Sequence, residues 1–366
     1  MKSPLIPSVR RTARSLFLSL ACSLAAFGGL APASAATPPT VRVENIRRVF
    51  HNGEHNAFTD LIRWKGKFWL AFRSCPEGHQ VSQKASVIIL SSEDAKTWQQ
   101  VNQFSVPGRD TRDPHFLIFG DKLFVYSGTA YVGKENIRTT EWNAHLGYAT
   151  WTTDGAKWAE PKALEGTYGH YIWRAAAHGG KAYLVARRWQ NWEAPSPAPG
   201  SKAGRDTMQA ALLESEDGLR WRFRSFFQET QGNETSFLFE PNGELISVSR
   251  ATMTSSVLGH SKPPYQKWTR ETLDGFIGGP VLAKWGGHLL VGGRRVTPQG
   301  PRTTLLWLEG TQLKPFAELP SDGDNSYPGF VEYKDGRGLV SWYSTHEKGA
   351  DGKPFTAIYL ADLVKN

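Results

Sequence analysis

The chain has 366 residues, of which 40% are hydrophobic and 12% aromatic, and its formal net charge is +9. This apolar and aromatic content excludes an intrinsically disordered chain, and beyond residue 40 no apolar run is long enough to span a membrane. Gly and Pro are spread evenly between short runs rich in Trp, Tyr, Phe, Val and Thr, a pattern that predicts an all-β protein.

Residues 1–35 have the features of an export signal. Basic residues at positions 2, 10, 11 and 14 precede an apolar stretch over 16–30 and a small-residue cleavage site at 33–35. Removing this segment, which holds four basic and no acidic residues, lowers the net charge from +9 to +5. That modest surplus, without a basic run, argues against nucleic-acid binding. We therefore predict an exported protein, periplasmic or extracellular, in which residues 37–366 form a single domain.

A strand–turn–strand pattern recurs six times along this domain. Each copy places Gly in a tight turn between two short apolar runs, which is typical of a β-hairpin. The turn glycines are 44 to 63 residues apart, close to the length of a propeller blade. The copies span residues 60–73, 115–126, 174–185, 237–248, 280–291 and 329–340. They predict a six-bladed β-propeller with four-stranded blades, in which a strand over 41–49 closes the ring against residues 355–363.

A second repeat lies between the hairpins. A Ser or Thr is followed two residues later by Asp and four residues after that by Trp, at 92–98, 152–158 and 215–221, with a degenerate copy at 261–268. In such a turn the Asp carboxylate accepts hydrogen bonds from backbone N–H groups and the Trp packs between blades. We expect Trp98, Trp158 and Trp221 to be mostly buried. These turns resemble the Asp-box of sialidase-like propellers.

Polar side chains at the inner strand ends of a propeller meet around its axis, although they are far apart in sequence. Two of the candidates have a structural alternative. Asp113 precedes Pro114 and would also fix a turn, and Arg174 follows Trp173 and would also stack at a blade interface. The candidates for a sugar-binding mouth are Asp60, Arg73, Arg112, Asp113, His115, Tyr171, Arg174, Glu234, Arg250, Arg294 and Tyr327.

Across residues 37–366 the chain resembles the exported sialidase-like propellers of the neuraminidase superfamily. In sialidases a Tyr attacks the anomeric carbon, a Glu takes its proton, an Asp acts as acid and base, and three Arg hold the substrate carboxylate. The resemblance rests on four segments in matching order and blade position: Asn233-Glu234-Thr235, Ser249-Arg250, Gly293-Arg294 and Ser326-Tyr327-Pro328-Gly329.

The resemblance implies Tyr327 as nucleophile, Glu234 as its base, and Arg250 and Arg294 as carboxylate ligands. Sialidases supply the third Arg from an Arg-Ile-Pro segment in the first blade, whereas residues 56–60 of this chain contain no Arg. Two Arg can still hold a carboxylate, and Arg73 and Arg112 are the candidates to replace the third. Asp60 or Asp113 is the expected acid/base. Residues 55–60 and 112–114 look like elements of a separate exported branch. The remaining expected substrate-binding residues are Arg174, His115 and Tyr171.

These patterns favour an exo-acting glycoside hydrolase of sialidase type, with an acidic glycan as its partner and no cofactor. One alternative is a propeller polysaccharide lyase acting on uronate, suggested by His170-Tyr171 and Arg187-Arg188; another is a glycan-binding propeller without turnover. No metal site is predicted, because His51 and His55 are four residues apart where no helix is expected. If the first hypothesis holds, the Glu234 carboxylate lies within hydrogen-bond reach of the Tyr327 hydroxyl.

Overall fold

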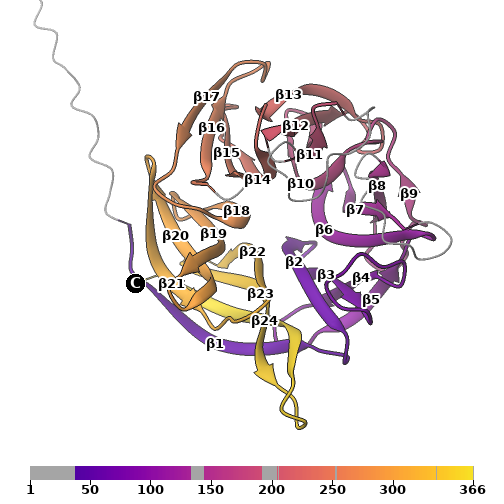
Figure 1. The fold of residues 1–366 in the computed structure, drawn as a ribbon, viewed down its shortest axis with the longest axis vertical. Helices are drawn as coiled ribbons and strands as arrows, with labels where there is room; N and C mark the ends of the chain where they lie inside the picture. The colour runs from indigo at the N-terminus through magenta and orange to yellow at the C-terminus, as the bar shows by residue number, and fades with distance from the viewer. Residues whose placement is uncertain are drawn as a thin grey trace, which may run out of the picture. The chain divides into compact units, whose positions relative to one another are not determined.

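The computed structural model describes residues 38–132, 144–191, 204, 206–251, 254–334 and 336–365, so the export signal predicted over 1–35 lies outside it. These residues form six four-stranded antiparallel sheets, arranged around an axis as the blades of a β-propeller (Figure 1). The all-β class and the six-bladed architecture are confirmed. Within the described ranges, no helix is long and apolar enough to cross a membrane.

Each blade runs from an innermost strand at the axis to an outermost strand. Blade 1 contains β2 (His55–Trp64), β3 (Lys67–Cys75), β4 (Ser86–Ser92) and β5 (Gln99–Phe104). Blade 2 contains β6 (Arg109–Phe119), β7 (Lys122–Tyr131), β8 (Leu146–Thr152) and β9 (Lys162–Ala163). Blade 3 contains β10 (Tyr171–His178), β11 (Lys181–Trp189), β12 (Met208–Ser215) and β13 (Arg222–Gln228).

The remaining blades follow the same order. Blade 4 contains β14 (Gly232–Phe239), β15 (Leu245–Ala251), β16 (Val257–Ser261) and β17 (Trp268–Thr272). Blade 5 contains β18 (Gly278–Trp285), β19 (His288–Thr297), β20 (Gly300–Glu309) and β21 (Gln312–Leu319). Blade 6 contains β22 (Asn325–Lys334), β23 (Arg337–Lys348), β24 (Pro354–Lys365) and, as its outermost strand, β1 (Val41–Phe50).

The ring closes through β1. This strand pairs antiparallel with β24, so that Val41 lies opposite Lys365 and Phe50 opposite Ile358. Blade 6 is therefore built from both ends of the described chain, as Figure 1 shows in indigo and yellow. The predicted pairing of residues 41–49 with 355–363 is confirmed, and it gives the sixth blade its fourth strand.

The repeated turns make the expected backbone contacts. Asp94, Asp154 and Asp217 each use one carboxylate oxygen to accept two backbone N–H groups at 2.8 Å. Trp221 is 5% exposed and packs edge-on against Tyr126 of blade 2. Trp98 and Trp158 are only partly buried. The turns therefore join adjacent blades, but Trp221 carries more of that packing than the other two.

Every innermost strand has an irregular register close to its first residues. The positions without a regular partner are 58–59 in β2, 113 in β6, 173–174 in β10, 233–234 in β14, 279–280 in β18 and 327–328 in β22. Phe58, Asp113 and Tyr327 have positive φ angles of 62°, 50° and 49° there. A bulge bends its strand and re-aims a side chain. This ring of six bulges turns the inner strand ends toward one another at the mouth.

Candidate active site

The centre of the site is a pair formed by Tyr327 and Glu234. The Tyr327 hydroxyl donates to Glu234 Oε1 at 2.5 Å, although the two residues are 93 positions apart in sequence. Glu234 Oε2 accepts from Arg250 Nη1 at 2.7 Å and from the Gly279 N–H at 3.1 Å. Glu234 and Tyr327 are 7% and 8% exposed. Blades 4, 5 and 6 therefore hold one carboxylate in a fixed position against one phenol.

The charge states of this pair are those of a base and its proton donor before any reaction. Burial disfavours the Glu234 carboxylate, but Arg250, Arg187 and the Tyr327 hydroxyl outweigh it and lower the pKa of Glu234 to about 2. Burial and the neighbouring Glu234 charge raise the pKa of Tyr327 well above its ordinary value. At neutral pH the carboxylate is ionised and the phenol protonated. The phenol proton already lies on a hydrogen bond to the group that would accept it.

A second pair, formed by Asp113 and Tyr171, lies beside the first. The Tyr171 hydroxyl donates to Asp113 Oδ2 at 2.5 Å, while Asp113 Oδ1 is buried and has no hydrogen-bond partner among the described residues. Burial raises the pKa of Asp113, more than Arg112 and the Tyr171 hydroxyl lower it. A carboxyl that keeps its proton to higher pH is suited to general-acid catalysis.

Three partly exposed guanidinium groups surround the two pairs. The side chains of Arg112, Arg250 and Arg294 are 13%, 22% and 25% exposed. The Arg294 guanidinium lies 5.9 Å from the Tyr327 ring centre. Arg112 lies 5.0 Å from the ring centre of Phe58, in the first-blade segment that lacks the Arg of sialidases. Of the two arginines expected to replace the missing one, Arg112 is therefore the one that lies beside this segment.

Arg73 is fully buried, and all of its donor atoms are engaged. Its Nε donates to Asp110 at 3.0 Å, and its terminal nitrogens donate to the carbonyls of Gly78 and Gln80 at 2.9 and 2.8 Å. With its side chain 0% exposed, Arg73 has no surface to offer a ligand. The expectation that it contacts substrate is corrected: it anchors the loop after β3.

Asp60, Arg174 and His115 form a cluster on three innermost strands, in which His115 Nδ1 lies 3.5 Å from Asp60 Oδ2. Arg174 Nη1 donates to Asp60 Oδ1 at 3.0 Å, and its other nitrogens donate to the carbonyls of Pro280 and Pro328. Asp60 Oδ2 also accepts the Phe116 N–H at 2.8 Å. Although burial opposes it, Arg174 and His115 hold the pKa of Asp60 below its ordinary value.

This axial ion pair connects blades 1, 2, 3, 5 and 6. It corrects three expectations. Asp60 is already neutralised by Arg174 and is not poised as an acid/base. Arg174 donates to backbone carbonyls of the scaffold and lies 5.1 Å from the ring centre of Trp173, so the contacts support its predicted structural alternative, stacking at a blade interface. His115 is 2% exposed and packs edge-on against Trp173.

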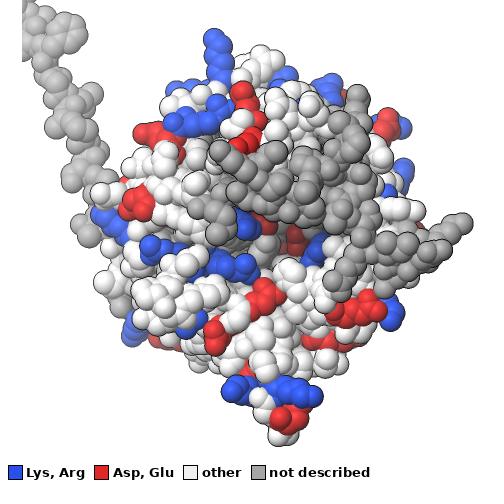
Figure 2. All heavy atoms as spheres, viewed as in Figure 1, with Lys and Arg blue, Asp and Glu red and all other residues white. Residues whose placement is uncertain are grey.

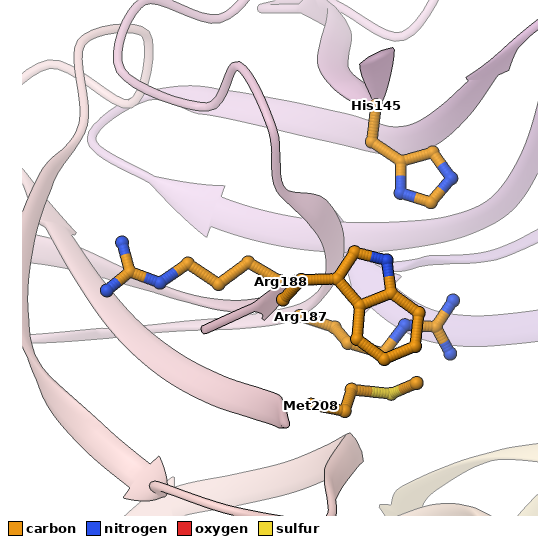
Figure 3. A pocket seen from close by; sticks show the side chains of 5 residues that line it. His145, Arg187, Arg188 and Met208 are labelled. Carbon is orange, nitrogen blue, oxygen red and sulfur yellow. The ribbon is translucent and has the colours of Figure 1, made fainter. Parts of the chain in front are cut away.

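Two residues that were not among the predicted site residues lie next to Tyr171. The Arg187 guanidinium lies 4.9 Å from the Tyr171 ring centre and donates to Asn233 Oδ1 at 2.7 Å. The His145 ring lies 5.0 Å from the Tyr171 ring. In Figure 3 His145 and Arg187 line a pocket together with Arg188 and Met208, and the two arginines point in opposite directions.

A sequence signal for Arg187 existed. It follows the second strand of its predicted hairpin by two residues, the spacing at which Arg250 follows its own hairpin.

Figure 2 shows that acidic and basic side chains surround a hollow near the middle of this face of the molecule. The mouth thus combines two carboxyl–phenol pairs with several arginines, a set of groups suited to acid–base and nucleophilic chemistry on an anionic ligand.

The fold is that of the sialidase-like propellers. A Trypanosoma rangeli sialidase in complex with the inhibitor DANA matches 84% of this chain with a TM-score of 0.62 and 13% identity, over 55% of its own length. A phage phi92 endosialidase matches 88% of this chain with a TM-score of 0.62 and 12% identity, over 69% of its own length. Zg3597, a family 117 glycoside hydrolase of the marine bacterium Zobellia galactanivorans, matches 89% with a TM-score of 0.51 and 11% identity, over 90% of its own length.

The chain therefore spans just over half the length of the Trypanosoma sialidase that it matches. No family model matches the sequence, and no curated protein matches it either. At 11 to 13% identity these likenesses establish the fold and not the reaction.

Proposed function

We propose that this protein is an exported glycoside hydrolase of sialidase type, which removes a terminal acidic sugar with retention of configuration. The observation that carries the proposal is the buried hydrogen bond between Tyr327 and Glu234, with Arg112, Arg250 and Arg294 around it. A phenol is an apt nucleophile for an anionic sugar, because a carboxylate in its place would repel the substrate's own carboxylate.

In the first half of the proposed reaction, the arginines bind the substrate carboxylate and place its anomeric carbon at the Tyr327 oxygen. That oxygen forms a bond to the anomeric carbon while Glu234 takes the phenol proton. The bond from the anomeric carbon to the leaving oxygen breaks, and Asp113 donates the proton that the leaving oxygen needs.

In the second half, ionised Asp113 takes a proton from a water molecule that attacks the anomeric carbon. The bond to Tyr327 breaks, and Glu234 returns the proton to the phenolate. Both carboxyl groups end in their starting states. Tyr171 has a positioning part, because its hydroxyl fixes the Asp113 carboxyl at 2.5 Å.

The proposal is tested with Tyr327→Phe on a panel of acidic glycans. The wild type should release a free acidic sugar, and Tyr327→Phe should bind the same glycan but not turn it over, because it lacks only the nucleophilic oxygen. Arg294→Ala should weaken binding by about 2–5 kcal/mol if it holds a buried carboxylate. Tyr265→Phe is the matched control, since its hydroxyl donates to the Gly243 carbonyl at 2.9 Å, outside the site. Full turnover by Tyr327→Phe would eliminate the covalent mechanism.

The grouping of His145, Tyr171 and Arg187 favours a second candidate, a uronate lyase. Such an enzyme needs a base and an acid beside an Arg that neutralises the uronate carboxylate. His170, the residue adjacent to Tyr171 in sequence, contacts the Tyr168 carbonyl instead, so His145 would take its part. Product analysis separates the two, because a lyase leaves an unsaturated, ultraviolet-absorbing uronate that Tyr171→Phe should abolish. A bound glycan without any product would indicate a binding protein.

A further inference from the structure

We propose that His55, His79 and Asp324 form a binding site for a divalent transition-metal ion, zinc foremost. Asp324 Oδ2 lies 2.9 Å from His55 Nε2 and 2.6 Å from His79 Nδ1. All three ligand atoms lie within 4.8 Å of one another. Two imidazole nitrogens and one carboxylate oxygen are a ligand set that zinc and its first-row neighbours prefer.

The fold brings these residues together from distant parts of the chain. His55 begins β2, His79 lies in the loop after β3, and Asp324 immediately precedes β22, so the site lies where blades 1 and 6 meet. The expectation of no metal site rested on the spacing of His51 and His55, where no helix was expected. His51 instead stacks on Phe355 with ring centres 4.2 Å apart. The partners of His55 are 24 and 269 residues away, so sequence spacing does not reveal them.

The surroundings of Asp324 hold it as a ligand. Its Oδ1 accepts from the Tyr343 hydroxyl at 2.9 Å and from Arg294 at 3.2 Å, and its backbone carbonyl accepts from Thr345 Oγ1 at 2.9 Å. The second oxygen, Oδ2, is thereby presented to both imidazoles. Carboxylates that bind metals are commonly oriented by such hydrogen bonds on the oxygen that faces away from the ion.

Solvent reaches the site mainly at His79. The side chains of His55, Asp324 and His79 are 10%, 27% and 57% exposed. Three protein ligands with an accessible side are the arrangement of zinc sites that keep a position open for water or substrate. The Phe58 ring packs edge-on against both His79 and Tyr327, with ring centres 5.4 Å and 5.1 Å apart. One aromatic ring therefore lies between the site and the proposed nucleophile.

The test measures metal binding and not turnover, so it stands apart from the proposed hydrolase. The purified chain is stripped with a chelator and titrated with Zn²⁺ by calorimetry and with Co²⁺ by absorption. The wild type should bind one equivalent of ion, with a rise in its unfolding midpoint on metal addition. His79→Ala should weaken binding by at least about tenfold, the scale on which even outer-shell changes act. Because its side chain is largely exposed, this variant should fold.

Asp324→Asn provides a second ligand variant, and His51→Ala and His260→Ala are the matched controls. His260 Nδ1 pairs with Glu244 at 3.0 Å on blade 4, so its removal tests whether any surface imidazole accounts for the binding. Both controls should bind like the wild type. Binding that is unchanged in His79→Ala and Asp324→Asn would place the ion elsewhere. A wild type that binds no ion would show that the three side chains form only a hydrogen-bonded cluster. Either result overturns the proposal.

Discussion

Replacing Asp60 by Asn tests whether the axial ion pair is structural. The change keeps the side-chain shape but removes the charge that Arg174 faces at 3.0 Å. Because an amide has one oxygen where the carboxylate has two, the new side chain can accept from Arg174 or from the Phe116 N–H, but not from each through a separate oxygen. Asp60 and Arg174 are 7% and 8% exposed, so water screens their charges only weakly. Leaving one member of a buried pair uncompensated costs about 3–5 kcal/mol. We expect Asp60→Asn to lower the free energy of unfolding by that amount.

The assay is a double-mutant cycle followed by urea unfolding. Arg174→Met leaves the Asp60 charge unpaired and should be similarly destabilising, whereas Asp60→Asn with Arg174→Met removes both charges together. The double variant should therefore lose less stability than the two single changes added together, by more than about 1 kcal/mol. Losses below about 1 kcal/mol in each single variant, or strict additivity, would refute the ion-pair reasoning. Asp60 would then return as a candidate acid/base.

Three further predictions follow from the same contacts. Asp113→Asn should lower kcat/KM by about 10²–10⁴-fold and remove the decline at high pH, where the raised-pKa carboxyl of the wild type loses its proton; an unchanged pH profile would exclude Asp113 as the acid. Glu234, with a pKa of about 2 against an ordinary 4.5, stabilises the fold above pH 4.5 by about 3 kcal/mol and loses this contribution as the pH falls through 2, so urea midpoints measured from pH 5 to 2 should fall more in the wild type than in Glu234→Gln. Trp221→Ala should cost about 3–5 kcal/mol in thermal or urea unfolding and more than Trp98→Ala, and the reverse order would contradict the packing described for the turns.

The six-bladed architecture could be predicted because the same hairpin recurs in the sequence once per blade. Hairpin glycines such as Gly66 and Gly287 have positive φ angles and lie in short turns whose signals extend over a few residues. The N-terminal strand before residue 55 has no hairpin of its own. Its pairing with the last strand could therefore be predicted, because the sixth blade needs a fourth strand to be complete. Local turn chemistry and counting were sufficient for this part of the fold.

The site was predictable only in part, for a physical reason. Tyr327, Glu234, Arg250 and Arg294 meet because each follows or precedes a hairpin at an inner strand end, and the sequence shows those positions. Whether such a side chain faces the mouth or packs against a neighbouring blade depends on the bulge in its own strand, and that bulge has no clear sequence signal.

Asp60 and Asp113 illustrate the difference, since both are acidic residues on inner strands. Asp113 occupies the irregular position of β6, whereas Asp60 lies just past that of β2, where it meets Arg174. The same uncertainty of facing explains why Arg73 was expected to contact the substrate of the hydrolase, whereas Arg187 entered only the lyase alternative.

The most direct test of the proposed mechanism is mass spectrometry of the protein after incubation with fluorinated sugars that trap glycosyl–enzyme intermediates. The panel should include a fluorinated sialic acid and a fluorinated uronic acid, and Tyr327→Phe is treated in parallel. The account predicts one added sugar mass, located by peptide mapping on Tyr327 and absent from Tyr327→Phe. An adduct on any other residue, or an adduct that persists in Tyr327→Phe, would contradict it.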